Sequence, residues 1–259
     1  MTHNLHKSNT TGQPVFFQHG LCGSAAQTIE AFPDDPRFCL HTLECRGHGI
    51  SESGDHKAFS INTFADDVAA SIEANTNSPI IIGGISLGAA IALHLAVHRP
   101  HLVKALVLAR PAWAIDDAPD NMRPNAEIGA LLTNHPPHVA KTKFLASATA
   151  KHLTKTAPDN LASLLTFFDR HPIAVTSALL TKISADGPGV TEQQVRTLSI
   201  PILIIATAQD AIHPMAHAQK LHDLMPHSRL VEITPKGVDK QAYVTEFRQT
   251  LLHFFEENT

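Results

Sequence analysis

Short apolar runs alternate with longer amphipathic stretches along the first 110 residues and again from about residue 200 onward. The short runs are rich in Val, Ile and Phe, as buried strands are, whereas the longer stretches carry apolar residues at helical spacing. This alternation predicts an α/β fold, with a mostly parallel sheet whose strands are joined by helices. The expected strands are 15–18, 38–43, 80–83, 103–109, 202–206 and 229–233, and the expected helices are 24–32, 60–75, 87–98, 215–224 and 241–257.

The pattern changes between residues 111 and 197, where strand-like runs vanish and several helical stretches lie among prolines. A block of this length is too long for a structureless loop. We therefore expect a core domain formed by residues 1–110 and 198–259, and a helical insertion at 111–197 that acts as a lid over the candidate site described below.

Few residues precede the first expected strand, so the sheet is predicted to have about six or seven strands. Its first edge then needs a cover, because an open strand edge pairs readily with other chains. A loop could supply that cover, or a second copy of the chain in a homodimer.

Composition excludes several classes of function. The net charge of −4 argues against a nucleic-acid partner, and no apolar run approaches the roughly 20 residues that span a membrane. The N-terminus lacks a signal-peptide pattern, which predicts a cytoplasmic protein.

The 18 histidines form i,i+4 pairs at 94/98 and 213/217, but such pairs are expected by chance at this histidine content. We expect no metal and no cofactor.

The segment Gly84-Ile85-Ser86-Leu87-Gly88 lies between an expected buried strand and an expected helix. A serine at such a junction stands on a tight turn, the flanking glycines avoid clashes there, and the helix N-terminus favours negative charge beside it. Ser86 is therefore a candidate nucleophile.

Three further segments accompany this Gly-x-Ser-x-Gly turn in a characteristic order. Residues 16–23 form a strand that ends in His-Gly, residues 43–51 contain an Arg-Gly-His-Gly turn, and residues 202–214 form a strand that ends in a loop with Asp210. In this order the chain resembles the α/β-hydrolase fold over nearly its whole length outside the helical insertion.

The resemblance implies a role for each matching residue. Ser86 would be the nucleophile, and the backbone N–H groups of Leu21 and Leu87 would form the oxyanion hole, as suits a free N–H at a helix N-terminus. Asp210 would be the acid that orients the catalytic histidine.

The histidine itself departs from the family pattern. In the family it lies on the loop after the last strand, but here residues 234–242 contain no histidine. Three residues could act as base instead: His213, three positions after Asp210; His19, beside the predicted oxyanion hole; and Lys236, if it were desolvated.

Two arginines are candidate substrate contacts. Arg110 ends an expected strand at the edge where the site should lie, and Arg123 follows it in the insertion. An arginine there suits a substrate carboxylate or phosphate, although Arg110 could instead pair with Asp116 or Asp117. His19 is a further candidate for substrate binding.

Together these features predict a cofactor-independent hydrolase that acts on a small-molecule ester, lactone or thioester, including substrates that carry a negative charge. The missing histidine leaves two alternatives open. One is a ligand-binding protein or receptor without catalysis, and the other is a lyase or decarboxylase on the same fold.

Overall fold

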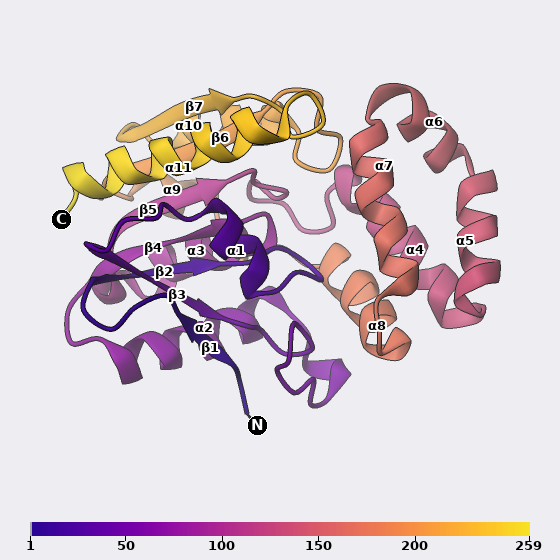
Figure 1. Ribbon diagram of the computed structural model, residues 1–259, viewed down its shortest axis with the longest axis horizontal. Helices are drawn as coiled ribbons and strands as arrows, with labels where there is room; N and C mark the ends of the chain where they lie inside the picture. Colours follow the sequence, from indigo (N-terminus) through magenta and orange to yellow (C-terminus); the bar gives the residue numbers. More distant parts are fainter. Residues whose placement is uncertain (1) are drawn as a thin grey trace.

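The computed structural model describes residues 2–259 and contains a seven-stranded sheet in the order β1-β3-β2-β4-β5-β6-β7 (Figure 1). Every neighbouring pair from β3 to β7 is parallel, and only β1 runs antiparallel to its neighbour. The predicted α/β class with a mostly parallel sheet is thus confirmed. The strands are β1 (Leu5–Lys7), β2 (Gln13–Gln18), β3 (Phe38–Leu43), β4 (Ile80–Ile85), β5 (Val103–Ala109), β6 (Ile202–Thr207) and β7 (Ser228–Ile233).

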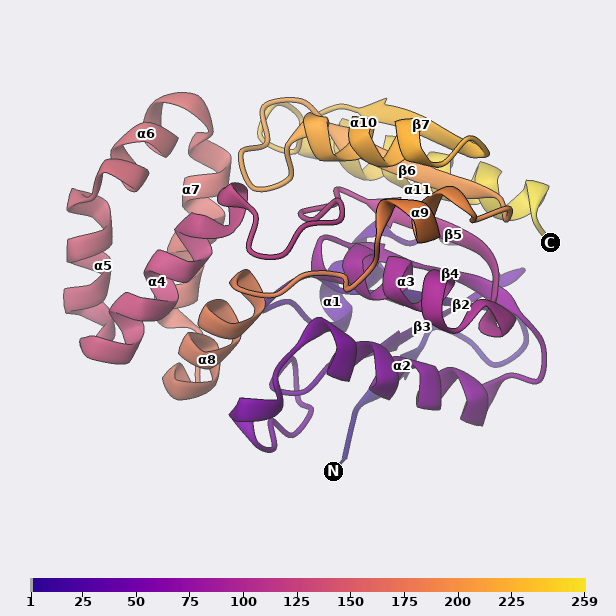
Figure 2. The same cartoon turned by 180° about the vertical axis from the view of Figure 1, so that it is seen from behind.

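Helices cover both faces of the sheet. Because side chains alternate along a strand, Val15 and Phe17 of β2 pack on one face and Phe16 packs on the other. On the first face lie α1 (Ala25–Ala31) and α11 (Lys240–Glu257), as Figure 1 shows. On the second lie α2 (Ile61–Asn75), α3 (Leu87–His98) and α10 (Met215–Leu224), seen in Figure 2. These five helices match those predicted from the sequence.

The first edge of the sheet is covered by β1, which the sequence did not predict. Leu5 pairs with Leu43 and Lys7 pairs with His41 of β3. This strand has only three residues and ends in a lysine, two features that discourage further pairing at an edge. The open edge of β3, on which the expectation of a homodimer rested, is therefore occupied by the chain itself.

Between β5 and β6 the chain forms a group of helices that stands apart from the sheet (Figures 1 and 2). We call α4 to α8 the helical segment; its interior holds Ile128, Phe144 and Phe168, all fully buried. No helix among residues 2–259 is both long and apolar enough to span a membrane. The remaining elements are α4 (Arg123–Asn134), α5 (Pro137–Ala146), α6 (Ala148–Thr156), α7 (Pro158–Leu165), α8 (Ile173–Ser184), α9 (Glu192–Arg196), η1 (His56–Ala58), η2 (Pro100–Leu102), η3 (Asp120–Met122) and η4 (Thr166–Asp169).

The histidine pair on α3 forms hydrogen bonds to residues 188 and 189, where the chain returns from the helical segment to the sheet. His94 Nδ1 donates to the carbonyl of Pro188 at 2.9 Å, and His98 Nε2 donates to that of Gly189 at 2.9 Å. Within residues 2–259 no group of three or more His, Cys, Asp or Glu side chains could hold a metal ion. The i,i+4 spacing of this pair thus has a structural use.

Candidate active site

Ser86 stands at the sharp turn between β4 and α3. Its backbone has φ 58° and ψ −109°, a region that is strained for a residue with a side chain. The turn is held by the Ser86 N–H, which donates to the carbonyl of Ala109 at 2.9 Å. Only 8% of Ser86 is exposed, and it lines a cavity of about 680 Å³. A buried hydroxyl on a strained, fixed turn is the geometry expected of a nucleophile elbow.

The glycines beside Ser86 allow the strand and the helix to approach each other. A Cβ atom on Gly84 would lie 2.6 Å from the carbonyl carbon of Gly88 and 2.7 Å from the carbonyl oxygen of Gln18. These contacts are with backbone atoms, which cannot turn aside as a side chain can. Larger residues at these two positions would therefore force the elbow away from β2.

Two backbone N–H groups, one in the loop after β2 and one at the start of α3, are candidates for binding an oxyanion. Neither the N–H of Leu21 nor that of Leu87 has an acceptor among the described residues. Leu87 is the first residue of α3, where a helix leaves N–H groups free. Leu21 lies in the loop after β2, which is fixed by a hydrogen bond of 2.7 Å from the Gly20 N–H to Gln27 Oε1.

His19 supports this loop from behind and does not line the cavity. It is fully buried; its Nδ1 donates to the Gly20 carbonyl at 2.9 Å, and its Nε2 accepts from the Cys45 N–H at 3.1 Å. Burial lowers the pKa of His19, so its ring is neutral. With both nitrogens engaged, His19 is available neither as a base nor as a substrate contact.

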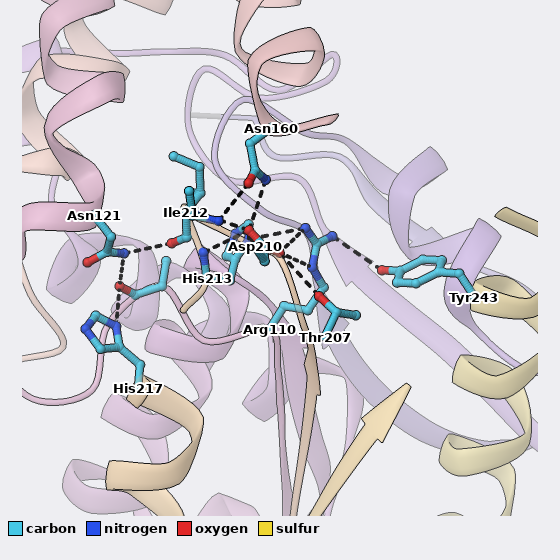
Figure 3. A network of polar contacts seen from close by, with 11 residues as sticks. Arg110, Asn121, Asn160, Thr207, Asp210, Ile212, His213, His217 and Tyr243 are labelled. Atoms are coloured by element: carbon cyan, nitrogen blue, oxygen red, sulfur yellow. Dashed lines mark hydrogen bonds and ion pairs between the residues drawn. The ribbon is translucent and has the colours of Figure 1, made fainter. Parts of the chain in front are cut away.

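Asp210 is the centre of a polar network at the end of β6 (Figure 3). Its carboxylate accepts from Arg110 Nη2 at 2.6 Å and from Asn160 Nδ2 at 2.9 Å, and it contacts His213 Nδ1 at 2.9 Å. The backbone N–H of His213 donates to the same carboxylate at 3.0 Å. Burial raises the pKa of a carboxyl group, but the charges and hydrogen bonds of His213 and Arg110 outweigh it and hold the pKa of Asp210 far below its usual range.

His213 reaches from this network into the cavity that contains Ser86. Since Asp210 accepts from Nδ1, the proton sits there and Nε2 carries the free lone pair. Nε2 has no partner among residues 2–259, yet it is not sealed in the interior. Burial, together with the charge of Arg110, lowers the pKa of His213 although Asp210 raises it. The imidazole is therefore neutral at neutral pH and able to accept a proton.

The loop after β7 contributes nothing to this cavity. Lys236 pairs with Glu30 at 2.9 Å and lies over the ring of Tyr243, with Nζ 5.8 Å from its centre. It faces a separate cavity of about 360 Å³ behind Arg110. Its ammonium group is partly exposed and already paired, so it lacks the desolvation that a lysine base requires.

With this geometry in view, comparison with known proteins identifies the family. Residues 13–237 match the family model of the α/β-hydrolase fold. The chain belongs to this family.

Its relatives within the α/β-hydrolase family include esterases. The chain is 28% identical over 246 residues to a protein of Mycobacterium tuberculosis that carries the provisional name non-heme bromoperoxidase BpoC, covering 92% of this chain and 91% of that one. It is 29% identical over 227 residues to the pimeloyl-[acyl-carrier protein] methyl ester esterase of Neisseria meningitidis, covering 84% and 68%. A thermophilic esterase from Thermogutta terrifontis has the same fold, with a TM-score of 0.76 at 18% identity over 99% of this chain and 94% of that one.

Of the two arginines predicted to bind substrate, the structure brings only Arg110 to the cavity. Arg110 pairs with Asp210, not with Asp116 or Asp117, and its Nη1 lies 3.4 Å from the hydroxyl of Tyr243. Arg123 does not line the cavity: 80% of its side chain is exposed, and its Nη1 lies 3.8 Å from Asp120 Oδ1.

Among the cavity residues that sequence reasoning did not single out are Asn125, Asn160 and Arg170. Asn160 on α7 donates to Asp210, and its Oδ1 accepts from the Ala211 N–H at 2.7 Å. These residues lie in the helical segment. The apolar periodicity of its helices does not show which residues of the sheet they will contact. The clusters of prolines and polar residues between its helices were the only signals of its boundaries.

Proposed function

We propose that this chain is a serine hydrolase that acts on a small ester, lactone or thioester. One observation carries the proposal: His213, held by Asp210 through Nδ1, lines the same cavity as Ser86. An acid, a base and a nucleophile in this relation are the parts of a catalytic triad, which is recognised by geometry and not by sequence position. The base here comes from the loop after β6 instead of the loop after β7.

In the proposed first step, Nε2 of His213 takes the proton of the Ser86 hydroxyl as Oγ attacks the substrate carbonyl. The carbonyl oxygen becomes an oxyanion and accepts from the N–H groups of Leu21 and Leu87. When the tetrahedral intermediate collapses, the imidazolium gives its proton to the leaving alcohol or thiol, and an acyl-Ser86 ester remains. A water molecule then attacks the ester by the same route and releases the acid.

The energetic contributions have different sizes. Each oxyanion-hole donor stabilises the transition state by about 3 kcal/mol in comparable enzymes, and a positioned general base contributes about 10²–10⁴-fold. Asp210 keeps its negative charge across the neutral range, since its pKa is far below the ordinary value. It can therefore stabilise the imidazolium that forms on His213.

The helical segment would determine which substrates enter. Residues from α4, α7 and η4 line the cavity together with loops of the sheet, so the segment would act as a lid over Ser86. The Neisseria relative is named for a methyl ester, which supports an ester as the substrate class for this chain.

The proposal is tested with a panel of 4-nitrophenyl esters of short acids, with Ser86→Ala as the loss-of-function variant. Ser163→Ala is the matched control, because Ser163 lines the same cavity from α7 but is not at the elbow. We expect Ser86→Ala to abolish turnover and Ser163→Ala to retain at least half of it.

Two other results would replace the proposal. Turnover that survives in folded Ser86→Ala would exclude Ser86 as the nucleophile and would favour chemistry in which the oxyanion hole stabilises an anion without covalent catalysis, as in the lyase alternative. Binding of esters without hydrolysis by the unsubstituted chain would instead favour a ligand-binding protein.

A further inference from the structure

The charged side chains that line the cavity around Ser86 are positive. No aspartate or glutamate is found among the described residues that line it, although the chain as a whole carries a net charge of −4. Two arginines do line it, Arg110 and Arg170. Their surroundings differ in a way that decides which of them is available to a ligand.

The charge of Arg110 is already compensated. Its Nε and Nη2 donate to Asp210 at 3.0 and 2.6 Å, and only 4% of the Asp210 side chain is exposed. An anion approaching Arg110 would also meet the negative charge of Asp210. Arg110 is therefore a structural partner of Asp210 and a weak attractor for a substrate.

Arg170 has no such compensation. It forms three hydrogen bonds, all to neutral oxygens: Nε to the Cys22 carbonyl at 3.1 Å, Nη1 to Thr176 Oγ1 at 2.9 Å and Nη2 to the Gly47 carbonyl at 2.6 Å. Within residues 2–259 it makes no ion pair. A guanidinium has five N–H groups, so two remain without an acceptor. A half-buried, unpaired cation at a cavity favours an anionic ligand.

The position of Arg170 places this charge close to the reaction centre. Cys22, whose carbonyl accepts from Arg170, directly follows Leu21, whose N–H is proposed for the oxyanion hole. In a bound substrate, the group that contacts Arg170 would thus be close to the carbonyl that Ser86 attacks. A substrate that carries an acidic group near its ester could therefore contact Arg170 and the oxyanion hole at the same time.

A second polar residue of the cavity also lacks a partner. Asn125 on α4 is only 4% exposed, lines the cavity, and has a buried Oδ1 without any hydrogen bond. The Nδ2 group of Asn125 also has no acceptor among the described residues, and unlike Oδ1 it is not sealed in the interior. It can therefore donate to an oxygen of a ligand in the cavity.

We propose that Arg170 binds a carboxylate of the substrate and that Asn125 forms a hydrogen bond to the same molecule, so that the enzyme selects short carboxylate-bearing esters. This inference rests on the proposed hydrolase function. The sequence analysis named Arg110 and Arg123 as the residues that bind an anionic substrate. This proposal assigns that role to Arg170, a residue of the helical segment that the sequence did not single out.

The test separates binding from catalysis by using Ser86→Ala as the parent protein. Isothermal titration measures the affinity for monomethyl glutarate and for methyl glutaramate, which replaces the carboxylate by a neutral amide of nearly the same shape. Arg170→Gln removes the charge and Arg170→Lys keeps it. Arg123→Gln is the matched control, since it removes an exposed arginine of the same segment outside the cavity.

We expect the parent to bind the carboxylate at least tenfold more tightly than the amide. Arg170→Gln should weaken carboxylate binding by about 10- to 100-fold, the range for hydrogen bonds to charged groups, and should leave amide binding within about threefold. Arg170→Lys should retain part of the preference, and Arg123→Gln all of it.

Three results would overturn the inference: no saturable binding of the carboxylate by the folded parent, equal affinity for the two ligands, or an equal loss of both in Arg170→Gln. The last result would mean that Arg170 only holds the loop of Cys22 in place. Failure of the hydrolase proposal is read separately, from turnover of neutral 4-nitrophenyl esters by the unsubstituted chain.

Discussion

The loops that follow β6 and β7 leave adjacent strands of the sheet, yet they differ in their relation to Ser86. The loop after β6 contains Asp210 and His213, both largely buried and linked by a hydrogen bond. The loop after β7 contains Lys236, which is paired with Glu30, and Val238, which is 65% exposed. Only the first of these loops lines the cavity around Ser86.

Under the proposed function, the base lies on the loop after β6 and not on the loop after β7. In the resembled family pattern, one loop supplies the acid and the other supplies the histidine. Here Asp210 is contacted by a histidine of its own loop, at i+3, while Arg110 and Tyr243 lie on the side toward α11. The predictions below test whether the base belongs to the loop after β6.

The largest effect is expected at His213. Asparagine keeps a hydrogen bond to Asp210 but cannot accept a proton, so His213→Asn should lower kcat/KM for a 4-nitrophenyl ester by about 10²–10⁴-fold. Lys236→Met, in the other loop, should change kcat/KM by less than about twofold, because an exposed ion pair contributes little. Steady-state kinetics on both variants measures the contrast, and equal losses would refute it.

Next comes the stability of the network around Asp210. Arg110→Met leaves a carboxylate, 4% exposed, without its arginine, and should lower the free energy of unfolding by about 3 kcal/mol. The hydrogen bonds from Asn160 and the His213 backbone remain and keep the loss near the lower end of the expected range. Urea unfolding with an unchanged slope would measure it. A loss below about 1 kcal/mol would mean that Arg110 and Asp210 are not strongly coupled.

A smaller effect is expected in the pH profile. The base must be neutral, and the pKa of His213 is lowered from 6.5 by burial and by Arg110, so kcat/KM should fall only below pH 6.5. Removing the charge of Arg110 removes one of the causes that lower this pKa. In Arg110→Met the acid limb should therefore move to higher pH, whereas in Lys236→Met it should stay in place. A shift in the opposite direction would contradict the assignment of His213.

The smallest effect is expected when a histidine is added to the loop after β7. Val238→His places an imidazole on an exposed position after Gly237, but the carboxylate of Asp210 is already occupied by Arg110 and His213. We expect kcat/KM within about twofold of the unsubstituted chain, and no recovery in the His213→Asn background, since an unoriented base adds little. A tenfold recovery there would show that the second loop can still hold the base.

The sheet and the elbow were predictable because their signals are local. Six strands and five core helices follow from periodic apolar patterns, and the tight turn at Ser86 is marked by glycines two positions away on either side. The strand β1 was missed because three residues, two of them His6 and Lys7, form no apolar pattern. Its strand character comes only from pairing with β3.

The contacts of charged residues were less predictable. Arg110 and Asp210 are 100 positions apart, and Arg170 and Cys22 are 148 apart, so no local pattern joins them. The sequence could indicate that Arg110 ends a strand near the site, but not that Asp210 neutralises it. It offered no reason to single out Arg170, whose proposed role rests on the absence of an ion-pair partner among the described residues.

The central claim is that His213 activates Ser86, and the rate at which a fluorophosphonate labels Ser86 tests it most directly. The labelling rate measures the reactivity of the Ser86 hydroxyl. It does not depend on recognition of a substrate by the helical segment or on release of a product. The account predicts rapid labelling of the unsubstituted chain at neutral pH, a loss of at least about 10²-fold in folded His213→Asn, and an unchanged rate in Lys236→Met. An unchanged rate in His213→Asn, or no labelling of Ser86 in the unsubstituted chain, would contradict it.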